Sequence, residues 1–216
     1  MTEKFHAELK SLKSETLEMA HLGRFMLRTA VDALIRQDND LAASVVARKE
    51  EIHTLEVRLE EHCYQLIALN QPMAKDMRVI ACTLKVITAS LRIGRYGKVI
   101  ANIAKKISDQ PHIANLMTIP HMADLVIEMI DDAIEAYEKD SIDAISDFSA
   151  RDDTIDSLRQ SIFREGITYM MEDPKSITRC TNYILVARYL ERCADHACKI
   201  AENVHYMNTG ERIEIH

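Results

Sequence analysis

Apolar residues recur along most of the chain at intervals of three and four, the spacing of one face of an α-helix. The pattern predicts six long amphipathic helices, at residues 4–36, 39–69, 74–107, 119–139, 141–171 and 174–207. Turn-forming residues separate them: Asp38 and Asp140 can end or cap a helix, and Pro72 and Pro174 can open one. Because short connections make neighbouring helices antiparallel, we expect an all-α bundle architecture.

The last predicted helix shows how such a helix packs. At 100° per residue, its small and apolar residues fall within a sector of about 100°. These residues are Leu190, Cys193, Ala197, Ile200, Ala201 and Val204. Arg188, Glu191, Asp195 and Glu202 lie on the opposite side, so we expect the three carboxylates to face away from the core.

The chain also repeats itself. A shift of 103 residues aligns residues 47–55 with 150–158, and a shift of 100 aligns Ile100-Ala101 with Ile200-Ala201. Each copy holds three of the predicted helices. We therefore expect two three-helix units, residues 1–108 and 109–216, packed together or joined end to end.

Composition narrows the class of protein. Five Gly and four Pro are too few for an all-β fold, and 47% hydrophobic residues suffice for a core. No apolar run reaches the 18 residues of a membrane span, and the N-terminal residues lack the apolar stretch of a signal peptide. The five cysteines include no Cys-x-x-Cys pair. We expect a cytoplasmic protein with buried, reduced thiols.

The net charge of −7 is unevenly distributed. Residues 1–108 carry 17 Lys and Arg against 13 Asp and Glu, whereas residues 109–216 carry 10 against 21. An acidic half argues against nucleic-acid binding, which depends on neutralising phosphates. It permits metal cations or basic partners instead.

Two pairs of acids stand one helical turn apart in the second unit, Asp152 with Asp156 and Glu191 with Asp195. Like charges at this spacing destabilise a helix by about 0.2–0.5 kcal/mol per pair. A cation bound between the two acids would make the interaction favourable instead. Carboxylate sets suit Mg, Mn, Ca or iron. The alternative is a solvated acidic face, because the same spacing recurs elsewhere. The other pairs are Glu128/Asp132 and Asp143/Asp147.

The repeat sharpens the metal hypothesis. The first-unit counterparts of the four acids are Lys49, His53, Leu91 and Arg95, so all four carboxylates are missing together. This pattern indicates a site kept in one unit and lost in the other. In the first unit a basic stripe takes its place, formed by Arg95, Lys98, Asn102, Lys105 and Lys106. The stripe suits an anion, an acidic partner or an anionic membrane surface, or is an ordinary solvated helix face.

Two other functions fit an all-helical chain. Di-iron bundles use Glu-x-x-His pairs, and the chain has such pairs at Glu50/His53 and Glu202/His205. These two pairs fall in different units, which disfavours a shared centre and hence a di-iron oxidoreductase. A helical scaffold without metal is the second alternative.

Two segments resemble the PhoU family of phosphate-uptake regulators. They are Gln71-Pro-Met-Ala-Lys-Asp-Met-Arg78 and Tyr189-Leu-Glu-Arg-Cys-Ala-Asp-His-Ala-Cys-Lys-Ile-Ala-Glu-Asn-Val-His-Tyr-Met-Asn-Thr-Gly-Glu211. The resemblance implies a cytoplasmic, non-enzymatic protein, often a homodimer and peripheral to the membrane. It implies action with a phosphate ABC transporter and a sensor histidine kinase, restraining phosphate uptake and the starvation response when phosphate is plentiful.

The resemblance also implies a metal site. The family's motif is an acid-x-x-x-Asp pair that holds a metal ion or multinuclear cluster of iron or another metal. In the second unit it maps onto Asp152/Asp156 and Glu191/Asp195, with iron, manganese or magnesium as the expected metal. The first unit departs from the motif at all four positions, so we expect one metal site per chain.

Overall fold

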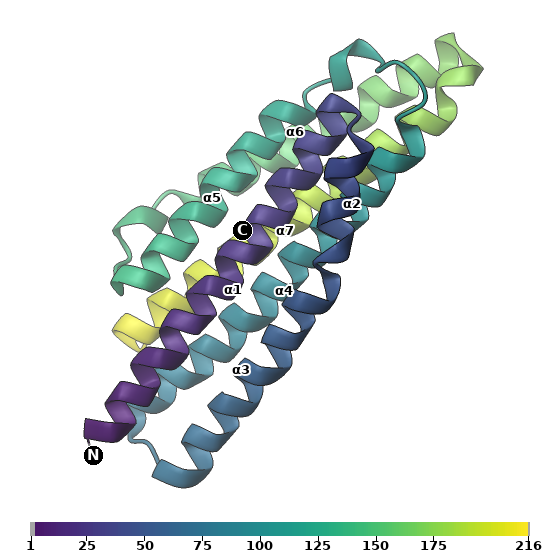
Figure 1. Cartoon of the computed structure of the whole chain (residues 1–216). Helices are drawn as coiled ribbons and strands as arrows, with labels where there is room; N and C mark the ends of the chain where they lie inside the picture. The colour runs from purple at the N-terminus through teal and green to yellow at the C-terminus, as the bar shows by residue number, and fades with distance from the viewer. Residues whose placement is uncertain (1–2, 216) are drawn as a thin grey trace.

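The computed structural model describes residues 3–215, apart from the side chain of Asn115, and this described part contains helices and no strands. The long helices run along one axis of an elongated molecule (Figure 1). The α-helices are α1 (Glu3–Arg36), α2 (Asn39–Ala47), α3 (Lys49–Asn70), α4 (Ala74–Ile107), α5 (Ile119–Lys139), α6 (Phe148–Glu172) and α7 (Ile177–Thr209). Three short 3-10 turns join them: Ala114–Leu116, Asp143–Ile145 and Pro174–Ser176.

The helix boundaries follow the local chemistry. The Asp38 side chain accepts a hydrogen bond from the Leu41 backbone N–H at the start of α2. Gln71 and Asp140 adopt left-handed backbone conformations that end α3 and α5. The Asp173 side chain accepts from the Lys175 backbone N–H before Pro174 turns the chain into α7.

Three predicted ranges need correction. The helix predicted at 39–69 is divided at Arg48, whose backbone N–H bonds to the Val45 and Val46 carbonyls as the cap of α2. The helix predicted from residue 141 begins at Phe148, because the Ser141 hydroxyl accepts from the Asp143 backbone N–H and holds a turn there. The 3-10 turn at Pro174 likewise delays the start of α7 to Ile177.

The expected pair of three-helix units is confirmed, packed side by side. One unit contains α1 to α4, in which α2 and α3 together form the second predicted helix, and the other contains α5 to α7. The units meet where α4 packs on α7 and α1 packs on α5, and these are equivalent helices of the repeat. A single hydrophobic core runs through both units, so the seam between them is part of the core.

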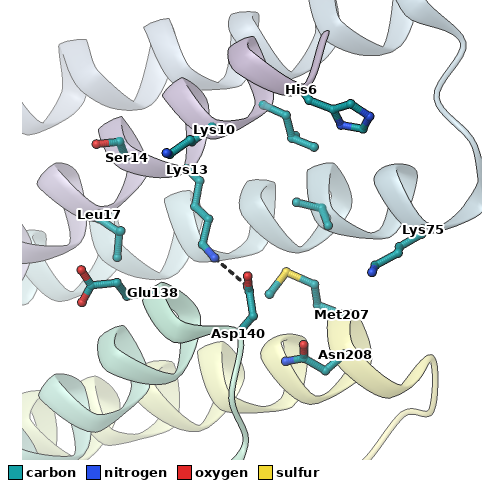
Figure 2. Close-up of a pocket in the computed structure, with 12 residues that line it drawn as sticks. His6, Lys10, Lys13, Ser14, Leu17, Lys75, Glu138, Asp140, Met207 and Asn208 are labelled. Carbon is teal, nitrogen blue, oxygen red and sulfur yellow. Dashed lines mark hydrogen bonds and ion pairs between the residues drawn. The ribbon is translucent and has the colours of Figure 1, made fainter. Parts of the chain in front are cut away.

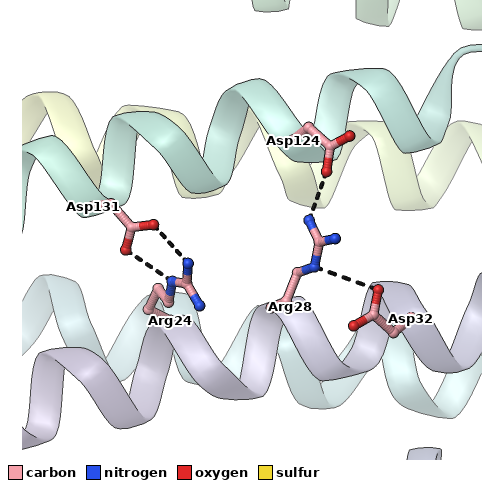
Figure 3. A network of polar contacts seen from close by, with 5 residues as sticks. All are labelled: Arg24, Arg28, Asp32, Asp124 and Asp131. Carbon is pink, nitrogen blue, oxygen red and sulfur yellow. Dashed lines mark hydrogen bonds and ion pairs between the residues drawn. The ribbon is translucent and has the colours of Figure 1, made fainter.

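Charged side chains join the units at the edge of the seam (Figure 3). Arg24 of α1 binds Asp131 of α5, and Arg28 one turn further along α1 binds both Asp124 of α5 and Asp32 of α1.

Among the described residues, no helix is long and apolar enough to cross a membrane.

Candidate metal centre

The structure places the four predicted acids along the contact between α6 and α7, and we call this four-acid set the acidic groove. Asp152 and Asp156 lie one turn apart on α6, and Glu191 and Asp195 lie one turn apart on α7. Helices α6 and α7 pack together, and side-chain contacts cross between them at Glu191 and at Asp152. Arg159 Nε of α6 lies 3.6 Å from Glu191 Oε1 of α7. The predicted juxtaposition of the two acid pairs is therefore present.

Burial and neighbouring acids raise the pKa of two of the four carboxylates, Asp152 and Glu191. Burial raises the pKa of Asp152, and the negative charges of Asp195 and Asp156 raise it further. Burial also raises the pKa of Glu191, and Asp195 and Asp156 add to the rise against the opposing charge of Arg159. The negative charges of Asp156 on α6 and Asp195 on α7 therefore act on both Asp152 and Glu191.

Cations of the chain itself partly neutralise the set. Arg159 Nε lies 3.9 Å from Asp156 Oδ1 as well as close to Glu191, and Arg192 donates to Asp195 Oδ2 at 3.1 Å. The Cys198 thiol lies 3.7 Å from Asp152 Oδ1. Two groove atoms are buried without a hydrogen-bond partner, Glu191 Oε2 and Arg159 Nε. An unsatisfied buried carboxylate oxygen is costly and leaves a donor site free for a ligand.

The acids do not form a closed ligand set. Within residues 3–215, no three His, Cys, Asp or Glu side chains are placed to hold one metal ion. The structure therefore supplies oxygen donors from two helices in one groove, with side-chain orientations set by the neighbouring arginines. Asp152, Asp156, Glu191 and Asp195 stay the predicted ligands.

The carboxylates of α7 are more covered than the helical pattern predicts. Only 18% of the Glu191 side chain and 13% of the Glu202 side chain are exposed. The expectation that they face freely away from the core is therefore wrong in part. Helix α6 covers Glu191, and the C-terminal segment covers Glu202, whose Oε1 accepts from the Ile215 backbone N–H. The apolar face predicted for α7 is buried, from Leu190 to Val204.

The corresponding surface of the first unit has the opposite chemistry. Lys49 pairs with Glu50, and His53 Nδ1 lies 2.9 Å from Glu56. Leu91 is buried in the core, and Arg95 is exposed. Arg95, Asn102, Lys105 and Lys106 of the predicted basic stripe are exposed, and Lys98 is half-buried.

The Glu-x-x-His pairs stay apart. His53 lies on α3 and pairs with Glu56, whereas His205 lies on α7 and contacts the Glu211 carbonyl. Each histidine thus has its own partner in its own unit. The structure gives no support to a di-iron centre built from them.

The prediction of buried, reduced thiols is confirmed. All five cysteines are buried and free: Cys63, Cys82, Cys180, Cys193 and Cys198. Burial raises the pKa of Cys63 to about 12 and that of Cys82 to about 11. These thiols are therefore poor nucleophiles at neutral pH.

Sequence reasoning missed two residues of the groove, Arg159 and Cys198. A signal for Arg159 was present in the repeat, because its first-unit counterpart is Glu56. The pair His53–Glu56 in one unit thus corresponds to Asp156–Arg159 in the other, with the charges exchanged. The proximity of Cys198 to Asp152 depends on how α6 packs against α7, and the sequence carried no signal for it.

Known proteins resemble this chain over nearly its whole length. The family model described as "PhoU domain" matches residues 16–104 and 119–204. A "Phosphate-specific transport system accessory protein PhoU homolog" of Caulobacter vibrioides is 36% identical over 95% of this chain and 90% of its own length. The homologue of Clostridium acetobutylicum is 31% identical over 100% and 99%. The crystal structure of PhoU from Pseudomonas aeruginosa superposes with a TM-score of 0.92 at 33% identity, covering 96% of this chain and 100% of that one.

Proposed function

The chain belongs to the PhoU family, and from that premise we propose that it regulates phosphate uptake as a non-enzymatic partner of a phosphate ABC transporter. Full-length similarity to two accessory proteins of phosphate-specific transport carries the proposal. In this role the protein restrains uptake, and the starvation response, when phosphate is plentiful.

We propose that it works in the cytoplasm, at the membrane surface, as a homodimer. A sensor histidine kinase is the second proposed partner where the organism has one. The surface supports contacts of two kinds, because the groove of α6 and α7 is acidic and the stripe on α4 is basic. Complementary charge steers such contacts and fixes their specificity.

We further propose that the acidic groove binds a metal ion or cluster, of iron, manganese or magnesium. Asp152, Asp156, Glu191 and Asp195 would hold it. The four side chains are of the chemical type that these metals bind, because all four offer hard oxygen donors. In addition, Glu191 Oε2 is buried without a hydrogen-bond partner. A cation there would offset the mutual repulsion that raises the pKa of Asp152 and of Glu191. Its role would be to bridge α6 and α7, and not to perform chemistry.

Deletion of the gene tests the regulatory role. We expect phosphate uptake in high-phosphate medium to rise and starvation genes to be expressed, and we expect the native gene supplied in trans to restore both. Unchanged uptake together with unchanged starvation-gene expression would contradict the proposal.

Elemental analysis of the purified protein tests the metal site. We expect bound iron, manganese or magnesium to disappear in the double variant Glu191→Ala, Asp195→Ala. The matched control is Asp143→Ala, Asp147→Ala, which removes two acids at the same spacing outside the groove. Metal that survives the first double variant, or that is lost equally in the control, refutes the assignment.

A further inference from the structure

A cavity of about 570 Å³ lies where the first half of α1 and the start of α4 meet the C-terminal ends of α5 and α7 (Figure 2). Four apolar side chains from three helices line part of it: Leu9, Leu17, Val79 and Met207. Cations and polar groups line the rest: His6, Lys10, Lys13, Ser14, Lys75 and Asn208, together with the acids Glu138 and Asp140. The volume is typical of a pocket for a small organic ligand.

The positive charge of this cavity is only partly neutralised. Lys13 spans the cavity to bind Asp140, with Nζ 2.6 Å from Oδ1, and only 20% of its side chain is exposed (Figure 2). Lys10 and Lys75 approach from α1 and α4, and neither has an ion-pair or hydrogen-bond partner within residues 3–215. Two unpaired ammonium groups beside an apolar lining attract an anion that also carries an apolar group.

The internal repeat places different groups at the positions equivalent to the cavity lining. There the linker between α4 and α5 supplies hydrogen-bond acceptors. Gln37, the counterpart of Asp140, donates to the Gln110 carbonyl there, and Arg179, the counterpart of Val79, donates to the Pro111 carbonyl. At these equivalent positions the linker backbone therefore accepts from both polar side chains. At the cavity itself, Lys10 and Lys75 face no such acceptor within residues 3–215.

We propose that this cavity binds a nucleotide. Its phosphates would contact Lys10 and Lys75, as ammonium groups bind phosphoryl oxygens. Its base would lie against Leu9, Leu17 and Val79. The Asn208 side-chain nitrogen donates to the Val204 carbonyl, which leaves Oδ1 to accept from an exocyclic amine of the base.

The cavity is separate from the acidic groove. Met207 stands 12 residues beyond Asp195 on α7, about 18 Å along the helix, and the cavity lining includes none of the four groove acids. The inference therefore does not rest on the metal site or on the role in phosphate transport. Binding by the purified protein can fail or succeed independently of both.

Isothermal titration calorimetry on the full chain tests the inference. The buffer contains EDTA, so that no divalent metal bridges ATP to the acidic groove. We expect ATP to bind with a Kd below 1 mM at 150 mM salt, tripolyphosphate to bind at least tenfold more weakly, and adenosine to show no heat. Absence of ATP binding overturns the inference, and so does tripolyphosphate binding as tight as that of ATP, because the apolar lining would then play no part.

Paired variants locate the binding. Lys10→Gln with Lys75→Gln should weaken ATP binding at least tenfold, while the melting temperature stays that of the native chain because both residues are exposed. Lys105→Gln with Lys106→Gln removes the same charge from the exposed end of α4, outside the cavity, and should leave ATP binding unchanged. An equal loss in both double variants would show attraction to the overall charge and would overturn the site.

Discussion

Arg24 of α1 and Asp131 of α5 form a two-pronged ion pair, with Nε 2.8 Å from Oδ1 and Nη2 2.6 Å from Oδ2. The pair joins the two units of the chain (Figure 3). The parallel geometry requires the planar guanidinium, because an ammonium group makes one point contact. Even so, a third or more of each side chain is exposed, and solvent screens the attraction.

We predict that Arg24→Lys lowers the free energy of unfolding by about 0.2–1 kcal/mol, the range for exposed ion pairs. Urea unfolding measures the change. The control is the double-mutant cycle of Arg24→Ala with Asp131→Ala, whose coupling energy should be of the same size. A coupling energy of zero would mean that the pair does not stabilise the seam.

Gly97→Ala should destabilise the protein, although alanine is the better helix former by about 1 kcal/mol. A Cβ at Gly97 would lie 2.8 Å from the Leu27 backbone nitrogen and 2.9 Å from the Met26 carbonyl oxygen. Because backbone cannot move aside cheaply, α1 and α4 would have to separate, at a net cost of about 1–3 kcal/mol.

Gly166→Ala is the matched control for this clash. A Cβ there would lie 3.2 Å from Ile184 Cδ1, the end of a side chain that can rotate. Chemical denaturation should show Gly166→Ala as stable as the native chain or more so. If both variants lose stability equally, the close approach of α1 to α4 is not the cause.

Stability should depend on pH through Asp152. Its pKa is raised in the folded protein, by burial first and then by Asp195 and Asp156, so the folded state holds more protons than the unfolded state. The free energy of unfolding therefore falls as pH rises from the ordinary carboxyl pKa through the raised one. In metal-free protein, Asp152→Asn should be more stable at pH 7 by about 0.4–1 kcal/mol, from two repulsive pairs of about 0.2–0.5 kcal/mol each.

The advantage of Asp152→Asn should vanish below about pH 4, where the carboxylate is protonated in both states. Thermal melts in EDTA across pH 3.5 to 8 measure the difference. A variant less stable than the native chain at pH 7 would show that Asp152 is stabilising as an anion, contrary to the structure.

Arg159 should compete with a metal ion for the groove. Its Nε lies 3.6 Å from Glu191 Oε1 and 3.9 Å from Asp156 Oδ1. Its positive charge therefore partly neutralises the two carboxylates that would bind the metal. Arg159→Gln should therefore tighten Mn²⁺ binding several-fold, measured by calorimetry on metal-free protein. Arg164→Gln, at an exposed position on the same helix, should leave the affinity unchanged. Weaker binding by Arg159→Gln would mean that the arginine orders the ligands instead.

The helices could be predicted because their apolar period is long and regular. The ranges 4–36 and 74–107 differ from α1 and α4 by no more than one residue at each end. The division at Arg48 could not be predicted, since no Gly or Pro marks it. In the fold, the Arg48 guanidinium lies over the Phe25 ring of α1, a contact between helices that local sequence does not encode.

The acids of the groove could be predicted from the sequence, but the residues that surround them could not. Spacing placed Asp152 with Asp156 and Glu191 with Asp195, and the repeat showed that the first unit lacks both pairs. The repulsion between the pairs follows from the packing of α6 on α7, as does the position of Arg159. A helical pattern orients a residue about its own axis only. It cannot tell which neighbour will cover Glu191.

The seam of α4 on α7 gives the chain a property that two separate copies of one unit would lack. Either half alone would expose to water the apolar surface that its twin now shields. Joined by the connection between Ile107 and Ile119, the halves meet at a high local concentration, however dilute the protein. The pairing of the two units is therefore independent of expression level, and cutting this connection would make it subject to mass action.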